Sequence, residues 1–316
     1  MAGEAADEPV EFAILPDGRR IAYRRFGLPD GRPVLALHGT PGSRLKYAMA
    51  NAAAKDAGLA LISIDRWSYG QSDGHPRPSL AAFAEDMEAF ADGLGLGRFG
   101  VLGVSGGGPY AAAVAAVLGN RIVALALVAP VGPIAGAPQS PELSPFHRLA
   151  FRGLARTPGA MRFIFGGFRR LIARRDGSLA MRLASSRAAA VDRRMLCRPH
   201  ERQSLIVAFR AGLEPGAAGP AIDMTLFGQA WDVAPERITA PSRLWIGSED
   251  RHVPVAAARL LAMRIPGCIR SDLQGAGHYW VMQNMPEVLG WLSQPLADSL
   301  DQRIEDLRRD SPESAG

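Results

Sequence analysis

Short apolar runs separated by polar or glycine-rich turns recur through the first 130 residues and the last quarter of the chain. Each run has the length of a buried strand, and helical patterns such as residues 107–118 and 254–265 follow several of them. Ahead of these runs, residues 11–27 read as a hairpin that turns at Pro16-Asp17-Gly18. The alternation predicts an α/β fold with a doubly wound, mostly parallel sheet. The predicted parallel strands are residues 34–37, 59–64, 99–104, 122–130, 241–247 and 268–273.

Residues 131–235 interrupt this alternation. The segment opens with a stretch rich in proline and glycine, continues with arginine-rich amphipathic patterns, and contains no clear strand. A helical insertion between two strands of the sheet is the simplest interpretation. We therefore expect a core from residues 10–130 and 236–297, a helical cap over residues 131–235, a disordered tail at residues 1–9 and a charged tail at residues 298–316.

The overall composition is that of an ordinary globular protein. Of 316 residues, 47% are hydrophobic and 21% are charged, and no apolar run approaches the roughly 20 residues of a membrane helix. The N-terminus is acidic and lacks the pattern of a secretory signal, which predicts a cytoplasmic protein. The two cysteines, Cys197 and Cys268, lack metal-ligand spacing. A disulfide scaffold or a structural zinc site is therefore not expected.

The net charge of +5 is concentrated in the insertion. Residues 141–232 contain 15 arginines against 7 acidic residues, so the rest of the chain is slightly acidic. A solvated helical face is the simpler interpretation. The functional alternative is an entry surface for anionic or amphiphilic substrates, or for acidic lipid. The segment lacks interleaved aromatic residues and a nucleic-acid-binding module, so nucleic acid is not an expected partner.

A serine stands between glycines directly after the predicted strand 99–104. The pattern is Gly103-x-Ser105-x-Gly107, and a helical pattern begins at once after it. A tight strand-to-helix turn needs small residues at these two flanking positions. A serine hydroxyl becomes a useful nucleophile when a histidine accepts its proton and a carboxylate orients that histidine. Ser105 is therefore the candidate nucleophile.

Candidates for the other two groups follow later strands. Asp250 comes just after strand 241–247, and His278 comes just after strand 268–273. The order Ser, Asp, His is the order of the nucleophile-elbow hydrolases. Glu249 and Asp272 are nearby carboxylates, but Asp272 lies inside a predicted strand. His252 is interpreted as a surface or supporting residue, and no role is assigned to the histidines at positions 75, 147 and 200.

The segment HGTPGS at residues 38–43 follows strand 34–37. It offers the backbone N–H of Thr40, which together with the N–H of Gly106 forms a candidate oxyanion hole. We place the substrate pocket beside this loop. Its predicted lining residues are His38, Gly39, Trp67 and Trp280, and His38 is expected mainly to brace the loop.

Five motifs in this order resemble the α/β-hydrolase fold superfamily over roughly residues 10–130 and 236–295. They are His38-Gly39-x-Pro41-Gly42, Asp65-Arg66-x-x-Tyr69-Gly70-x-Ser72, Gly103-x-Ser105-x-Gly107, Asp250-x-x-Val253-Pro254 and Gly277-His278. The family's second motif usually has Pro and Gly where this chain has Trp67 and Ser68. This difference leaves the conformation of the loop open and brings an indole close to the expected pocket.

The resemblance implies a serine hydrolase with Ser105 as nucleophile, His278 as general base and Asp250 as its orienting partner. A serine at the elbow argues against the haloalkane dehalogenase and epoxide hydrolase branches, which look for aspartate there. We expect a small-molecule substrate, an ester or amphiphilic acyl compound, and no metal or organic cofactor. The alternatives are a peptidase of the proline iminopeptidase type, suggested by HGTPG, a C–C bond hydrolase, and a ligand receptor on the same scaffold. The basic cap counts against the peptidase, which needs acidic groups for a free amine.

Overall fold

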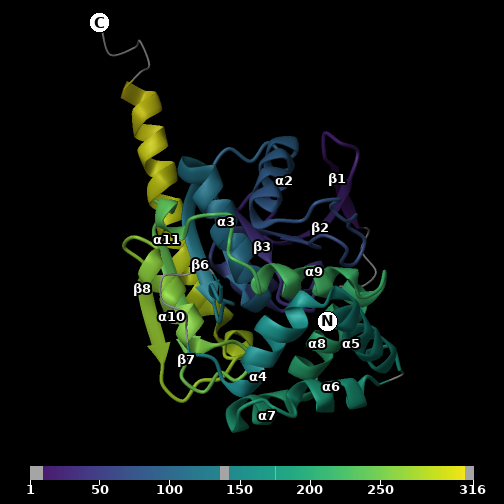
Figure 1. The fold of residues 1–316 in the computed structure, drawn as a ribbon. Helices are drawn as coiled ribbons and strands as arrows, with labels where there is room; N and C mark the ends of the chain where they lie inside the picture. The colour runs from purple at the N-terminus through teal and green to yellow at the C-terminus, as the bar shows by residue number, and fades with distance from the viewer. Residues whose placement is uncertain (1–9, 136–141, 175, 310–316) are drawn as a thin grey trace, which may run out of the picture.

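A single mixed sheet of eight strands forms the centre of the molecule (Figure 1). The structure is a computed structural model and describes residues 10–135, 142–174 and 176–309; the predicted tail 1–9 and residues 310–316 lie outside them. The strands are β1 (Glu11–Ile14), β2 (Arg20–Gly27), β3 (Arg32–Leu37), β4 (Leu59–Ile64), β5 (Phe99–Val104), β6 (Ile122–Val128), β7 (Ser242–Gly247) and β8 (Ile269–Leu273).

The strand order is β1-β2-β4-β3-β5-β6-β7-β8. Strands β3 to β8 are mutually parallel, whereas β2 runs antiparallel to both β1 and β4. Each predicted parallel strand is present, and the predicted hairpin is the β1–β2 pair, with Gly18 at φ 86° in its turn. The predicted α/β class and mostly parallel sheet are confirmed.

Helices cover both faces of the sheet, and each face has its own apolar core. Strand residues alternate between the cores: Val101 of β5 faces the first, and Leu102 faces the second. The first core includes α2 (Leu80–Gly93), α3 (Gly108–Leu118) and α10 (Val255–Arg264). The second includes α1 (Asn51–Asp56) and α11 (Val281–Arg309). This double coverage explains why β4, β5 and β6 are continuous apolar runs in the sequence.

The connection between β6 and β7 contains a helical insertion at the carboxyl end of the strands (Figure 1). It has a small apolar core of its own, which Met282 of α11 joins. Ala135 and Ala230 form an isolated β-bridge near the base of the insertion. Its helices are α4 (Pro145–Arg148), α5 (Pro158–Ile172), α6 (Ser178–Ser185), α7 (Ala190–Leu196), α8 (Pro199–Leu213) and α9 (Ala218–Phe227).

Three arginines of this insertion bond to backbone carbonyls at helix ends and turns. Arg169 Nε donates to the carbonyl of Leu213 at 2.8 Å, Arg210 Nε to that of Ile172 at 2.7 Å, and Arg193 to that of Ala188 at 2.5 Å. The last carbonyls of a helix lack intrahelical donors, and cationic groups there also complement the helix dipole. Part of the arginine content therefore serves the structure of the insertion.

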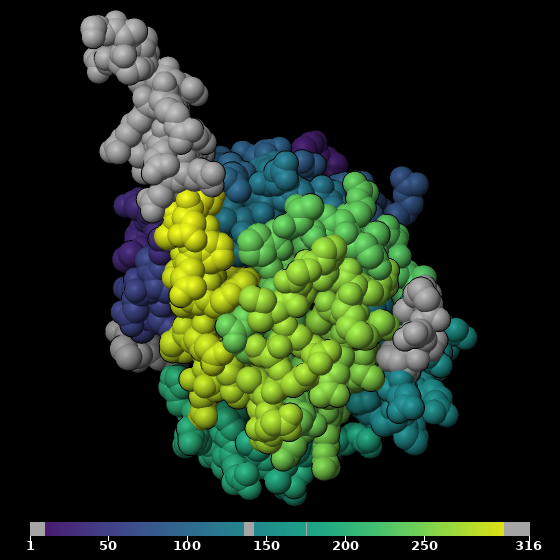
Figure 2. Space-filling model, turned by 90° about the vertical axis from the view of Figure 1, so that its left-hand side faces the viewer, coloured from purple at the N-terminus to yellow at the C-terminus, as the bar shows by residue number. Residues whose placement is uncertain are grey.

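The predicted boundary at residue 297 falls inside α11, which continues to Arg309 although Pro286 and Pro295 lie within it. Figure 2 shows this helix in yellow along one side of the molecule, with the insertion in teal at the other end. Among the described helices, none combines the length and apolar character that crossing a membrane would require.

Candidate active site

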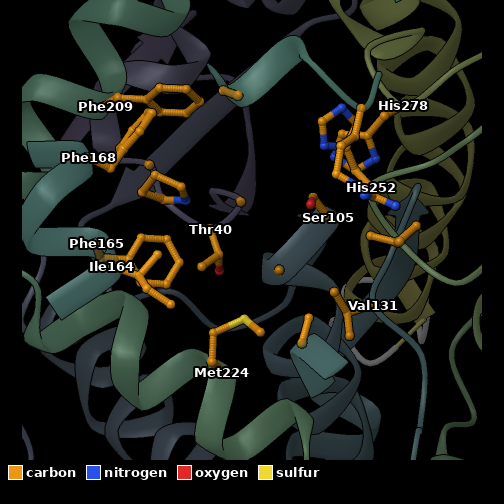
Figure 3. Close-up of a pocket in the computed structure, with 18 of the residues that line it drawn as sticks. Thr40, Ser105, Val131, Ile164, Phe165, Phe168, Phe209, Met224, His252 and His278 are labelled. Carbon is orange, nitrogen blue, oxygen red and sulfur yellow. The ribbon is translucent and has the colours of Figure 1, made fainter. Parts of the chain in front are cut away.

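Ser105 lies at a strained turn between β5 and α3. Its φ is +55°, a left-handed conformation that non-glycine residues rarely adopt. The neighbouring glycines are required by close contacts: a Cβ added to Gly103 would lie 2.6 Å from Ala111 Cβ, and one added to Gly107 would lie 2.3 Å from the carbonyl oxygen of Leu37. The turn presents Ser105 to a large cavity (Figure 3). This is the geometry that the sequence pattern predicts for a nucleophile elbow.

Asp250 and His278 meet beyond the ends of β7 and β8. Oδ2 of Asp250 lies 2.7 Å from Nδ1 of His278. Oδ1 of Asp250 accepts the backbone N–H groups of His252 at 2.8 Å and Val253 at 3.1 Å, which fixes the carboxylate. The alternative carboxylate, Asp272, instead pairs with Arg259 at 2.8 Å and Arg270 at 2.9 Å. Of the carboxylates considered from the sequence, Asp250 is therefore the one that orients His278.

The two groups shift each other's pKa values. Burial alone would raise the pKa of Asp250, but the charge and hydrogen bond of His278 outweigh burial and lower it. Burial likewise opposes charge on His278, yet the attraction and hydrogen bond of Asp250 raise the pKa of the imidazole above its ordinary value. The pair therefore favours a proton on Nδ1 of His278 and leaves Nε2 for a proton transfer. Figure 3 shows the rings of His278 and His252 beside Ser105.

Thr40 and Gly106 lie against each other at the wall of the same cavity. A Cβ added to Gly106 would lie 3.1 Å from the backbone nitrogen of Thr40 and 2.1 Å from its Oγ1. The two residues predicted to donate to an oxyanion therefore lie next to each other at the cavity. Figure 3 shows Thr40 and Ser105 on the same side of the cavity.

A buried polar network supports Thr40 from behind, and the sequence patterns did not indicate it. Asp223 of α9 accepts the hydroxyl of Thr40, two bonds from Arg66 at 2.6 and 2.8 Å, and the hydroxyls of Tyr69 and Tyr110 at 2.6 Å each. Both Asp223 and Arg66 are 1% exposed. Such a network holds its members in place, because removing one of them would leave a buried charge or donor unsatisfied. It joins the insertion to the oxyanion loop.

Asp192 of α7 is a second residue that the sequence patterns did not indicate. Its carboxylate accepts the backbone N–H groups of His278 and Tyr279, each at 3.0 Å. Gly277 permits this approach, because an added Cβ there would lie 2.3 Å from Oδ1 of Asp192. Burial raises the pKa of Asp192, although the two N–H bonds oppose that shift. The insertion therefore holds the backbone of the His278 loop.

Of the four residues predicted to line the pocket, Gly39 does so, whereas His38, Trp67 and Trp280 do not. His38 is fully buried and neutral, because burial lowers its pKa well below the ordinary value. Its Nδ1 bonds to the carbonyl of Gly39 at 2.7 Å, and its Nε2 accepts the N–H of Arg66 at 3.2 Å. These bonds brace the loop that carries Gly39 and Thr40.

The prediction that Trp67 lines the substrate pocket is wrong. Its indole is 2% exposed, donates to Asp86 at 2.8 Å and stacks on His75 at 4.5 Å between ring centroids. Ser68 adopts φ +59°, so this loop keeps a left-handed turn without glycine and directs the indole into the core. Trp280 packs against the second sheet core instead of the cavity.

The cavity has a volume of about 710 Å³ and lies between the sheet and the insertion. Its lining is mainly aromatic and aliphatic, with Phe165, Phe168 and Phe209 on the insertion side in Figure 3. His252 also lines it, 4.9 Å from the ring of His278 between centroids, and burial lowers its pKa to about 3. His252 therefore belongs to the cavity wall. Of the two interpretations drawn from the sequence, a surface residue or a supporting residue, the bond of its backbone N–H to Asp250 fits the second.

No group of three or more His, Cys, Asp or Glu side chains within the described ranges has the arrangement of a metal site. The residues that line the cavity bring to it the hydroxyl of Ser105, backbone donors and imidazoles, together with the cationic side chains of Lys46, Arg187 and Arg251. The hydroxyl, the backbone donors and the imidazoles are the groups that acyl transfer requires.

The sequence profile of the Alpha/beta hydrolase family matches residues 34–290. The chain belongs to this family. The structure resembles an alpha/beta hydrolase fold protein from Nakamurella multipartita, with a TM-score of 0.61, 27% identity, and coverage of 89% of this chain and 99% of that one. It also shares the fold of an esterase from Rhodococcus sp. ECU1013, with a TM-score of 0.64, 19% identity, and coverage of 92% and 99%.

Curated relatives match over a shorter region. A proline iminopeptidase from Xylella fastidiosa is 32% identical over 112 residues, which are 34% of this chain and 36% of that protein. The chain spans less than half the length of the curated relatives it matches. These relatives support the family membership of this α/β hydrolase and leave its substrate to be inferred from the site.

Proposed function

We propose that this α/β hydrolase is a serine hydrolase that cleaves a carboxylic ester through an acyl-enzyme intermediate. The contact that carries the proposal is the 2.7 Å approach of Asp250 Oδ2 to His278 Nδ1. It leaves Nε2 of His278 as the basic nitrogen, and His278 and Ser105 line the same cavity. A serine hydroxyl needs this assistance, because it is a weak nucleophile at neutral pH.

In the first half of the reaction, Oγ of Ser105 attacks the ester carbonyl carbon while Nε2 of His278 takes the hydroxyl proton. Negative charge then develops on the carbonyl oxygen, and the N–H groups of Gly106 and Thr40 bind it. When the tetrahedral intermediate collapses, the bond to the alcohol oxygen breaks and the His278 imidazolium protonates that oxygen. The acyl group remains on Ser105.

In the second half, a water molecule gives a proton to Nε2 of His278 and attacks the acyl carbon. The same two N–H groups bind the second oxyanion, and collapse returns the proton to Ser105 and releases the carboxylic acid. Asp250 stays ionised throughout and stabilises the imidazolium, in agreement with its lowered pKa. No step requires another protein group.

The cavity favours an ester over the alternatives considered from the sequence. A proline iminopeptidase must bind a free amine, but none of the described residues that line the cavity is Asp or Glu. Most of the residues that line the cavity around Ser105 are apolar, as an acyl chain requires. A C–C bond hydrolase would use the same triad, so the substrates that the protein cleaves are what distinguish it from an esterase.

The proposal is tested with purified wild type and Ser105→Ala on a series of 4-nitrophenyl esters of increasing acyl length, with prolyl 4-nitroanilide as the peptidase substrate. We expect ester turnover that Ser105→Ala abolishes, and no turnover of the anilide. Ester turnover that survives in Ser105→Ala, or anilide turnover exceeding ester turnover, would contradict the proposal. Binding without turnover of any ester would favour the ligand receptor.

A further inference from the structure

Among the described residues that line the cavity, Lys46 is a buried lysine. It lies in the 3-10 helix Arg44–Ala50, shortly after the oxyanion loop, and is one of only two lysines in the chain. The residue is 8% exposed, so more than nine-tenths of it is removed from water, and it lines the same cavity as Ser105 and His278. Long cationic side chains usually extend to solvent, so this position is unusual.

In the part of the chain that the structure describes, no carboxylate pairs with the Lys46 ammonium. Arg44, two residues away, is paired with Asp65, and the nearby Asp250 is paired with His278. Burial lowers the pKa of Lys46 to about 8, so the amine is mostly protonated at neutral pH. Its charge also acts on His278, whose pKa it lowers. A buried cation is costly unless an anion compensates it.

The other cationic side chains at the cavity differ from Lys46 in exposure. Arg187 and Arg251 are exposed, and the guanidinium of Arg187 lies 3.8 Å over the ring of Phe146. Solvent screens such charges strongly. The two arginines can attract an anion to the cavity. Once the anion is bound inside, the buried ammonium of Lys46 is the cationic group that it would contact.

We propose that the cavity binds substrates that carry a carboxylate in addition to the ester, with Lys46 as the residue that holds this carboxylate. The inference rests on the proposed function for the identity of the reaction, but the binding part stands without it. One ammonium matches one negative charge, and the apolar wall contacts the chain between the carboxylate and the ester. The predicted substrate class is therefore a half-ester of a dicarboxylic acid or a lactone that carries a carboxylate.

The test compares mono-4-nitrophenyl esters of succinate, adipate and suberate with the same compounds whose free carboxylate is methylated. We expect wild type to prefer the charged member at one of the three lengths. Lys46→Met should lower kcat/KM for that compound by about 10- to 100-fold, the range expected for a lost charge-assisted hydrogen bond. It should change kcat/KM for the methylated twin much less, through the effect of the Lys46 charge on His278 alone. Lys46→Arg should retain part of the preference. Lys55→Met is the matched control, because Lys55 is the exposed lysine, and it should change neither rate.

Equal losses for both members of the pair in Lys46→Met, or no loss for either, would overturn the inference while leaving the serine hydrolase proposal intact. Lys46→Met should fold, since an apolar chain replaces an unpaired buried charge. Calorimetric binding of octanoate and octanamide to Ser105→Ala, with and without Lys46→Met, gives a readout that needs no turnover. Lys46-dependent preference for octanoate supports the inference even if no ester is hydrolysed, and equal affinity for the two compounds contradicts it.

Discussion

The backbone N–H of His278 donates a 3.0 Å hydrogen bond to Oδ2 of Asp192, a residue of the helical insertion. The same carboxylate also accepts the N–H of Tyr279 at 3.0 Å. The loop that carries the proposed base is thus held by a segment outside the core of the fold. Asp192 is a positioning residue, because it acts on the reaction through the backbone of His278.

Asp192→Ala should lower both stability and kcat. The change leaves the buried N–H of His278 unpaired, at a cost of about 1–3 kcal/mol. It also removes the partner of the half-buried N–H of Tyr279 and frees the His278 loop. Urea unfolding and steady-state kinetics measure the two effects, and KM should change less than kcat. Asp176→Ala is the control, because Asp176 bonds the backbone N–H of Ser178 on the exposed surface. Unchanged kcat in Asp192→Ala would contradict the positioning role.

The Arg66–Asp223 pair should be important for stability. Its side chains are 1% and 2% exposed, so Arg66→Met leaves a buried carboxylate without its cation and should destabilise the protein by about 3–5 kcal/mol. Arg20→Met removes the exposed pair with Asp73, whose side chains are 54% and 38% exposed, and should cost about 0.2–1 kcal/mol. Denaturant midpoints compare the two. If Arg66→Met and Arg20→Met lost the same free energy of unfolding, burial would not control the strength of the Arg66–Asp223 pair.

The pH profile should report the His278–Asp250 pair. Only neutral His278 can accept the serine proton, so kcat/KM should fall as pH drops through a pKa above the ordinary imidazole value. Asp250→Asn removes the attraction that raises this pKa, so the inflection should move to lower pH and kcat should fall by about 10⁴-fold. Asp272→Asn is the control among neighbouring carboxylates and should leave the profile unchanged. An inflection that stays in place in Asp250→Asn would contradict the assignment.

Gly106→Ala should damage the oxyanion hole. The new Cβ would lie 2.1 Å from Oγ1 of Thr40, so the loop must shift, and loss of one oxyanion donor lowers kcat by about 10²–10³-fold. Gly93→Ala in α2 is the matched control, because nothing lies within 4 Å of its added Cβ. Steady-state kinetics and circular dichroism measure activity and folding. A folded Gly106→Ala with normal kcat would remove Gly106 from the proposed mechanism.

The central strands of the sheet were predictable because they are buried on both faces. β4 and β5 coincide with the predicted runs 59–64 and 99–104, since a strand between two cores must be apolar along its whole length. The elbow was also predictable, because close packing at Gly103 and Gly107 imposes a local glycine pattern. Structural features that depend on residues close together in the chain, such as a buried strand or a tight turn, can therefore be recognised from the sequence.

Asp192 and Asp223, which support the site from the insertion, could not be recognised from the sequence. Asp192 and His278 are separated by 86 residues, and Asp223 and Arg66 by 157. Nothing around either aspartate distinguishes it from a solvated acidic residue of a helix. Trp67 shows the opposite error, a sequence pattern that predicts a role the residue does not have. Its place within a motif predicted that it lines the cavity, but a bond to Asp86 and the turn at Ser68 direct it into the core. Such outcomes depend on tertiary contacts.

The nucleophilicity of Ser105 is tested most directly by intact-protein and peptide mass spectrometry after treatment with a fluorophosphonate, which phosphonylates an activated serine oxygen as fluoride leaves. We expect one adduct per chain, located on the peptide that contains Ser105 and absent from Ser105→Ala, with much slower labelling of His278→Ala. Failure of the folded wild type to react, or an adduct that persists in Ser105→Ala, would contradict the role of Ser105 as nucleophile.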